Sequence, residues 1–162
     1  MFGLSLQTYG AEVDQLRAEF GGTVDVAQVD QALRSKKYKI VTITHVDTST
    51  GVDVSFRFVS FPSVCPTSQL QNFFPLGVLS DPQLVAEAVN RISPETLVVL
   101  DAVCAVASED IQMDSWSIDV VISASQKGLG APPGLSVLIA SQKAMKVNFL
   151  SLVSAGHGAA FF

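Results

Sequence analysis

The alternation of apolar, strand-like runs with amphipathic, helix-like runs is the feature that most limits how this chain can fold. The strand-like runs are continuously apolar, which is typical of parallel strands buried on both faces. Strands are expected at residues 38–45, 96–101, 117–125 and 135–141, and helices at 25–36 and 80–93. The sequence therefore predicts an α/β fold, with a mostly parallel sheet and helices on both of its faces.

Capping residues support both predicted helices. Asp25 stands where the N-cap of the first helix is expected. Ser80 is the expected N-cap of the second helix, with Pro82 in its first turn. The segment 8–20 fits a helix and the flank of a strand equally well, and the sequence leaves that choice open.

The composition excludes several classes of function. The 162 residues fit one domain, and their net charge of −5 with no basic stripe beyond residues 35–39 argues against a nucleic-acid partner. Cys65 and Cys104 match no metal-binding spacing and are too few for a disulfide framework. No apolar run approaches the roughly 18 residues of a membrane span. With no targeting signal apparent, an intracellular location is expected.

Residues 52–77 do not fit the alternation. This segment is rich in Phe and Pro, and a Gly-Val pair stands at each of its edges, at 51–52 and 77–78. Without it, the strand that ends near residue 45 would reach the next helix through a short loop, which is the normal connection. The segment is interpreted as an insertion that interrupts a domain at 1–146. A lid or interaction segment and a translated intron are both open as its origin.

Polar side chains gather where the predicted strands end. In an open parallel sheet the carboxyl ends of the strands meet at one edge, where ligands bind. The hydroxyls and amides there could serve a phosphate or a phenolic oxygen. The residues concerned are His45, Asp47, Thr48, Ser49 and Thr50 after the first strand, Asp101 at the end of the second, and Ser125, Gln126 and Lys127 after the third.

Asp101 and Lys127 each have a simple structural explanation and a chemical one. Asp101 could cap a following helix, or its carboxylate could face a cationic group of a ligand. Lys127, in a Gly/Pro loop, could be a solvated charge, or a partly desolvated amine that forms Schiff bases. Together, at neighbouring strand ends, they favour a pyridoxal 5'-phosphate (PLP) site, in which a carboxylate keeps the pyridine nitrogen protonated.

The motifs "SASQKGLGAPPG", "VVLDAVCAVA" and "THVDTSTGV" resemble those of the class V, fold-type I PLP aminotransferases, in particular the alanine–glyoxylate/serine–pyruvate aminotransferase family. The resemblance covers residues 9–51 and 78–146. It implies a reaction that moves an amino group from alanine or serine to glyoxylate, giving glycine. It also implies amino acid and 2-oxo acid substrates, a homodimer, and a peroxisomal or cytoplasmic location.

The same resemblance implies a role for five residues. Lys127 would form the covalent link to PLP and carry the proton between substrate and cofactor. Asp101 would be the partner of the pyridinium nitrogen, and Val103 would pack on one face of the ring. Thr48 would contact the phenolic oxygen, and Gln126 would bind on the phosphate side. No metal ligand is expected, and His45 and Asp47 are given no chemical role.

The chain also departs from the family pattern. Nothing in it matches the turn that cradles the phosphate, the aromatic residue that stacks on the ring, or the arginine that binds the substrate carboxylate. Residues 147–162, with His157, form a divergent tail. The resemblance therefore predicts an incomplete large domain whose transaminase activity is impaired or absent.

Two alternatives remain open at this point. The chain could be a non-catalytic or mis-spliced α/β fragment, as the Phe-rich segment favours. It could also be related to the cysteine desulfurases. Those enzymes carry His before the lysine, where Gln126 stands here, and they need a mobile catalytic cysteine that neither Cys65 nor Cys104 is placed to supply.

Overall fold

The computed structural model describes residues 8, 12–16, 24–45 and 81–147. Thr48, the segment 52–77 and nearly all of the tail at 147–162 lie outside the described residues, so the predictions made for them keep that status. Among the described residues, no helix has the length and the apolar character needed to cross a bilayer.

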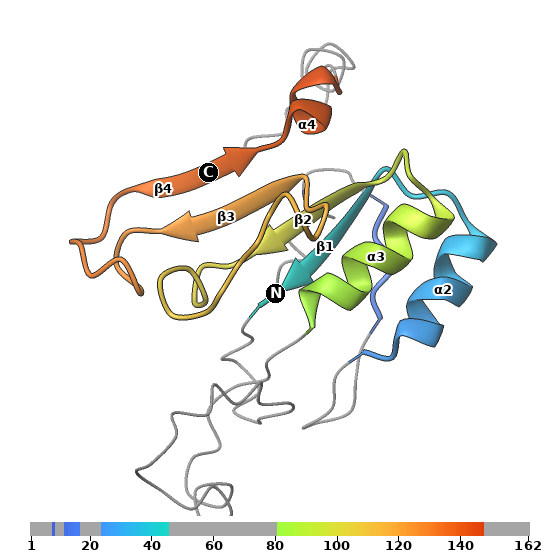
Figure 1. The fold of residues 1–162 in the computed structure, drawn as a ribbon, viewed down its shortest axis with the longest axis horizontal. Coiled ribbons are helices and arrows are strands. Elements are labelled where there is room, and N and C mark those ends of the chain that lie inside the picture. Colours follow the sequence, from blue (N-terminus) through green and yellow to red (C-terminus); the bar gives the residue numbers. More distant parts are fainter. Residues whose placement is uncertain (1–7, 9–11, 17–23, 46–80, 148–162) are drawn as a thin grey trace, which may run out of the picture.

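A four-stranded sheet forms the centre of the structure (Figure 1). Its strands are β1 (Ile40–Thr44), β2 (Leu97–Asp101), β3 (Val120–Ala124) and β4 (Ser136–Ala140), and they lie in that order across the sheet. β1, β2 and β3 are parallel, whereas β4 runs antiparallel to β3. The predicted mostly parallel α/β sheet is confirmed. The 11 residues between β3 and β4 fall below the dozen or more that a parallel crossover needs, which is consistent with the reversed direction of β4.

Helix α2 (Val26–Ser35) begins as predicted. The side chain of Asp25 accepts a hydrogen bond from the backbone N–H of Ala27 at 3.1 Å. The apolar side of this helix buries Val29 and Leu33. The predicted N-cap and the helical spacing of the apolar residues are thus both confirmed for α2.

Helix α3 (Pro82–Ile92) begins one residue later than predicted. Its N-cap is Asp81, whose carboxylate accepts the N–H of Leu84 at 3.1 Å, so the expectation that Ser80 caps it is wrong. Pro82 then occupies the first helical position, where its fixed φ and missing N–H cost nothing. A cap at Ser80 would have moved Pro82 one position further into the helix.

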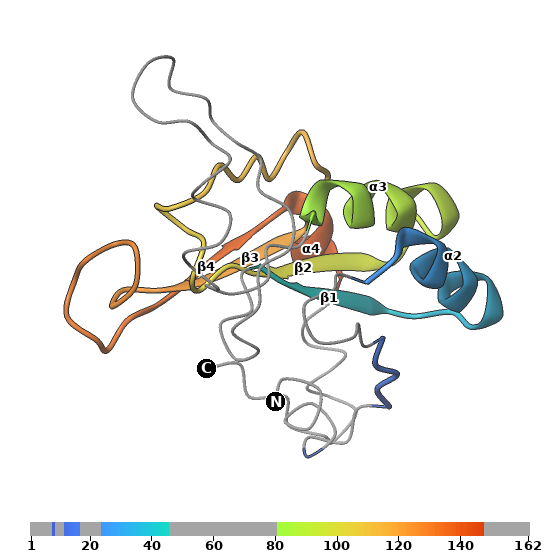
Figure 2. The same cartoon turned by 90° about the horizontal axis from the view of Figure 1, so that it is seen from below.

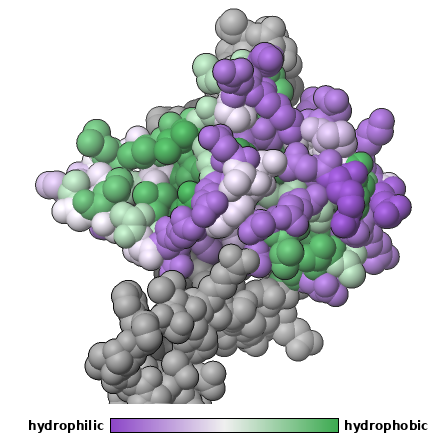
Figure 3. Space-filling model, in the orientation of Figure 1, coloured by the Kyte–Doolittle hydropathy of each residue, from purple (hydrophilic) through white to green (hydrophobic). Residues whose placement is uncertain are grey.

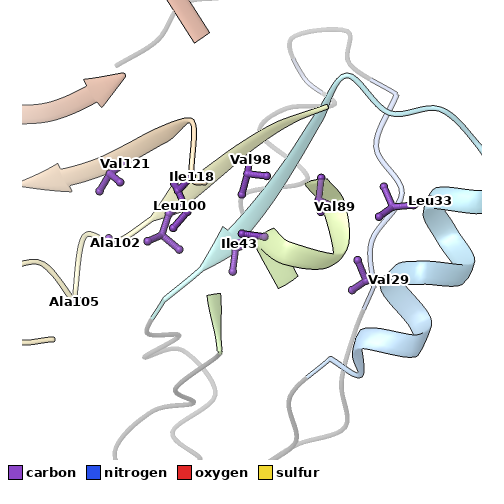
Figure 4. Packing of buried hydrophobic residues seen from close by; sticks show 11 residues of the cluster. Val29, Leu33, Ile43, Val89, Val98, Leu100, Ala102, Ala105, Ile118 and Val121 are labelled. Carbon is purple, nitrogen blue, oxygen red and sulfur yellow. The ribbon is translucent and has the colours of Figure 1, made fainter. Parts of the chain in front are cut away.

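One helical layer covers the sheet face that carries the core. Figure 2 shows α3 lying over the strands, and α2 packs against α3 near the β1 edge. The register places Ile43, Leu100 and Val121 on the same face of the sheet. They form one buried cluster with Val89 of α3 (Figure 4). The described residues confirm helical cover for this face, and cover of the opposite face stays a prediction.

A short helix, α4 (Gln142–Lys146), follows β4 and is tied to the sheet by a buried carboxylate that the sequence reading did not single out. Asp119 is 4% exposed. Its side chain accepts hydrogen bonds from the Val98 N–H at 2.9 Å, the Ser141 hydroxyl at 3.0 Å and the Lys143 ammonium at 3.0 Å. Lys143 also donates to the carbonyl of Thr96 at 2.9 Å. This network joins β2, β3 and α4 at the edge of the sheet opposite the strand ends discussed above.

Among the residues that the structure describes, Ser123 departs from the rule that buried polar groups are paired. It is 3% exposed, on the same sheet face as Val121, and its hydroxyl has no hydrogen-bond partner within the described ranges. A buried hydroxyl of this kind carries a desolvation penalty with no compensating hydrogen bond.

We therefore expect Ser123→Ala to leave the free energy of unfolding unchanged or to raise it by about 1 kcal/mol, because it removes an unpaired buried group. Urea denaturation followed by circular dichroism measures this. Thr96→Val is the control, since the Thr96 hydroxyl is bonded to the carbonyl of Tyr38 at 2.7 Å and its loss should cost about 1 kcal/mol. A clear loss of stability in Ser123→Ala would show that the hydroxyl has a partner.

Lys36 ties the segment 12–16 to the end of α2. Its ammonium lies 2.7 Å from Glu12 Oε1 and 3.0 Å from Asp14 Oδ2, and the Tyr38 hydroxyl donates to Asp14 at 2.8 Å. The hydrogen bond from Lys36, and then that from Tyr38, lowers the pKa of Asp14 below its ordinary value of 3.8.

A pH titration of the Asp14 carboxyl by NMR should therefore give a midpoint below 3.8, and Lys36→Met should return it toward that value. The pKa of Asp14 is lower in the folded state than in the unfolded state. At a pH above the unfolded-state pKa, the contact with Lys36 therefore contributes fully to the stability of the fold. Its contribution is lost as the pH falls through the lowered pKa. Lys37→Met removes a neighbouring charge as a control. An unchanged titration in Lys36→Met would contradict the assignment.

Candidate active site

The carboxyl ends of β1, β2 and β3 meet at one edge of the sheet, as predicted (Figure 1). Thr44 pairs with Asp101, and Asp101 pairs with Ile122 on β3. His45 follows β1, is 4% exposed, and donates its backbone N–H to the carbonyl of Asp101 at 2.8 Å. Asp101 is thus held between its two neighbouring strands.

A pocket of about 400 Å³ lies at this edge. Its volume is within the roughly 300–1,000 Å³ that is usual for small-molecule sites. The register puts Asp101, Ile122 and Ala124 on the sheet face opposite α3, so the pocket opens on that side. Its lining residues are Asp101, Val103, Ile122, Ser123, Ala124, Gln126, Gly134, Leu135 and Ser136.

Three residues predicted to bind the cofactor, namely Asp101, Val103 and Gln126, therefore lie around one pocket. The sequence reading missed the contribution of Gly134, Leu135 and Ser136. They reach the pocket because β4 is antiparallel, so its first residues return to the edge where β3 ends. The Gly/Pro-rich loop before β4, with 11 residues and no helical pattern, is the signal that could have indicated an antiparallel return.

The half-buried Asp101 carboxylate does not cap a helix. One of its oxygens, Oδ1, accepts the N–H of Val103 at 3.2 Å, and turns rather than a helix follow β2. The other oxygen, Oδ2, makes no hydrogen bond with any described residue, and Asp101 lines the pocket. Oδ1 thus orients the side chain through a local hydrogen bond from the backbone.

Lys127 follows Gln126 in the loop after β3, but it does not line the pocket. Its backbone carbonyl accepts the N–H of Gly130 at 2.9 Å, and its side chain is exposed. The expectation of a partly desolvated lysine is therefore wrong, because Lys127 belongs to the turns of the loop between β3 and β4. That loop projects beyond the strands (Figure 1). Within the part of the chain that the structure describes, its ammonium has no ion-pair partner.

Ser125 differs from the expectation that its hydroxyl serves a ligand. Its side chain is 3% exposed, and its hydroxyl donates to the carbonyl of Pro132 at 2.7 Å. The hydroxyl proton is therefore used within the loop. Cys104 is half-buried and is not among the residues that line the pocket, so the structure gives it no position beside a ligand there.

The sequence profile of the class-V aminotransferases matches residues 64–157, which is more than half of the chain. The chain belongs to the class-V aminotransferase family. Among similar family members, alanine–glyoxylate aminotransferase 1 of Saccharomyces cerevisiae is 35% identical over 145 residues, which are 89% of this chain and 31% of that protein. A serine–glyoxylate aminotransferase of Hyphomicrobium methylovorum is 30% identical over 142 residues, which are 86% of this chain and 29% of that protein.

The fold agrees with this family. The crystal structure of a subgroup IV aspartate aminotransferase from Thermus thermophilus superimposes with a TM-score of 0.67 and 25% identity, over 90% of this chain and 33% of that one. The chain thus spans about a third of the length of the family members it matches. The profile match at residues 64–157 includes the ends of β2 and β3, the residues that line the pocket, and Lys127.

Proposed function

We propose that this chain forms the PLP-binding part of an aminotransferase that moves an amino group from alanine or serine to glyoxylate, giving glycine. The observation that carries the proposal is the pocket that Asp101, Val103 and Gln126 share, with Lys127 next in sequence. Family membership and the names of similar proteins, alanine–glyoxylate and serine–glyoxylate aminotransferases, support the substrate class.

The residues around the pocket fit PLP. Asp101 Oδ2 can accept a hydrogen bond from a protonated ring nitrogen. Such a hydrogen bond is stronger than a neutral one because both partners are charged. Val103 offers an apolar contact to a ring, and the Gln126 amide can donate to a phosphate oxygen. Bound PLP would supply the electron sink that lets an amino acid lose its α-proton. Lys127 Nζ would hold the cofactor covalently, and once the amino group of the substrate has replaced it, the freed amine would take and return that proton.

The test is chemical attachment at Lys127. We expect the 162-residue chain, incubated with PLP and reduced with borohydride, to carry a PLP adduct on the peptide that contains Lys127, identified by mass spectrometry. Lys127→Ala should lose that adduct, and Lys146→Ala, at the exposed end of α4, should keep it. A chain labelled equally on all its lysines would sink the proposal.

We propose that the transaminase activity of the chain by itself is impaired or absent. The described arginines, Arg34 and Arg91, lie on α2 and α3 and do not line the pocket, and Arg91 is paired with Asp30 at 2.8 Å. No described arginine is thus placed to grip a substrate carboxylate, and poor orientation lowers both binding and rate. Rapid formation of glycine from alanine and glyoxylate by the purified chain would contradict this.

The working form that we propose is a homodimer in the peroxisome or the cytoplasm. Apolar side chains gather on the surface over β4 and the loop before it (Figure 3). Leu135, Leu138 and Ile139 are 52–69% exposed, which supports association with further protein there. Light scattering of the purified chain tests the dimer, and fluorescent tagging of the encoded protein tests the compartment.

We also retain the proposal that residues 52–77 interrupt a domain at 1–146 and that 147–162 diverge from the family. The family match begins inside the first of these segments, at residue 64, and extends to residue 157. Sequencing the transcript across residues 51–78 decides between a genuine insertion and a retained intron.

A further inference from the structure

The loop that carries Lys127 is closed at its base by Ser125. The N–H of Ser125 donates to the carbonyl of Leu135 at 3.1 Å, and its own carbonyl accepts the N–H of Ala131 at 3.0 Å. Its hydroxyl donates to the carbonyl of Pro132 at 2.7 Å and lies 3.4 Å from the N–H of Leu135. One buried side chain thus bonds to both of the residues that bring the loop back to β4.

The same loop is fitted against a neighbouring loop at Gly128. A Cβ built on Gly128 would lie 2.3 Å from the carbonyl oxygen of Val106 and 3.0 Å from Ser108 Oγ. Carbon and oxygen atoms do not approach to 2.3 Å without a bond, so any larger residue must push the two loops apart. The reason for glycine at this position is the close approach of two backbones.

Gly128 packs against the loop that follows β2, which includes Val103 and Val106. It is folded into turns, with the N–H groups of Ala105 and Val106 both donating to the carbonyl of Ala102 at 3.0 Å. Ala102 and Ala105 are fully buried, so this loop is anchored in the core. The contact at Gly128 therefore fixes the distance between the segment with Lys127 and the wall of the pocket with Asp101.

We propose that Ser125 and Gly128 are positioning residues for Lys127, with Ser125 closing the base of its loop and Gly128 seating the loop against the Asp101 wall. This inference rests on the proposed function, because it concerns where the attaching amine is held. An exposed lysine on a loose loop would sample many directions. A loop held at both points restricts the directions that the amine can take before the cofactor arrives, which reduces the ordering required on binding.

The experiment compares Ser125→Ala, Ser125→Thr, Gly128→Ala and Gly130→Ala in the 162-residue chain. PLP is added at a fixed concentration and reduced with borohydride, and the adduct on Lys127 is divided by the adduct on Lys146 in the same digest. We expect this ratio to fall about tenfold or more in Ser125→Ala and Gly128→Ala. Ser125→Thr keeps the hydroxyl and should retain the ratio within about twofold.

Gly130→Ala is the matched control in the same loop. Gly130 has a φ of +64°, so alanine there strains the backbone, but nothing lies within 4 Å of its added Cβ. It should lower the melting temperature while leaving the ratio unchanged, which separates loss of stability from loss of position. If Gly128→Ala does not fold, the pair of Ser125 variants decides alone.

The outcomes distinguish this inference from the function on which it rests. If the unaltered chain has no preference for Lys127 over Lys146, the proposed function fails and the inference fails with it. If the unaltered chain prefers Lys127 and Ser125→Ala or a folded Gly128→Ala keeps the same ratio, only the positioning role is overturned. A fall in Gly130→Ala equal to that in Gly128→Ala would also overturn it, because strain alone would then explain the effect.

Discussion

Replacing Asp119 with alanine should lower the free energy of unfolding by about 3 kcal/mol, the largest stability effect expected of a polar residue among those the structure describes. The change removes the acceptor of the Val98 N–H, which is fully buried and would be left unpaired. A buried donor left in this way costs about 1–3 kcal/mol. The Ser141 hydroxyl and the Lys143 ammonium lose the same partner.

Urea denaturation of matched variants separates these contributions. Asp119→Asn keeps an oxygen for the Val98 N–H, so we expect it to cost clearly less than Asp119→Ala. Lys143→Met should cost about 1 kcal/mol or less, because the Lys143 side chain is 36% exposed and a pair screened by water contributes little. Equal losses in Lys143→Met and Asp119→Ala would mean that the ion pair, and not the backbone hydrogen bond, sets the effect.

Asp101→Asn should weaken PLP binding by roughly 10–100-fold, because a hydrogen bond to a charged group contributes about 1.5–3 kcal/mol. The amide oxygen of asparagine can still accept the Val103 N–H, so the turn at the end of β2 should survive. The substitution then removes the negative charge while keeping the shape. Titration of PLP into the protein, followed by the visible absorbance of the bound cofactor, gives the affinity.

Asp110→Asn is the control for this charge change. Asp110 is exposed, accepts a hydrogen bond from Gln112 at 2.8 Å, and does not line the pocket. Its substitution alters the net charge by the same amount and should leave the affinity for PLP within about twofold. Unchanged PLP binding in a folded Asp101→Asn variant would contradict the proposal that the carboxylate binds the protonated ring nitrogen.

Much of the sheet could be predicted because apolar runs report burial directly. The four predicted strands are present, and the carboxyl ends of β1, β2 and β3 meet at the edge that holds the pocket, since parallel strands must end at the same side. The direction of β4 could not be read in the same way, because its apolar run is the same in either direction. The pocket residues contributed by β4 were missed with it.

Other features depend on contacts between segments that are distant in sequence. The close approach of Gly128 to Val106 is set by how two loops meet, which no local pattern reports. The exposure of Lys127 was one of the two readings that its Gly/Pro loop allowed. The buried hydrogen bonds of Asp119, in contrast, could have been predicted from the sequence. The argument applied to Asp101, that a carboxylate in an apolar run needs a partner, holds equally for the "SIDVV" run and would have indicated a buried bond there.

The polarity of β3 has a consequence for how this protein can change. The carboxylate network of Asp119 lies just before its first residue, and Gln126 and Lys127 lie just after its last. Substitutions that strengthen the fold at one end need not disturb the proposed PLP site at the other, so the usual conflict between stability and activity should be weak along this strand. A search for variants with a higher free energy of unfolding would therefore begin with the neighbours of Asp119, Ser141 and Lys143. It would leave unchanged the residues at the edge of the sheet that holds the pocket.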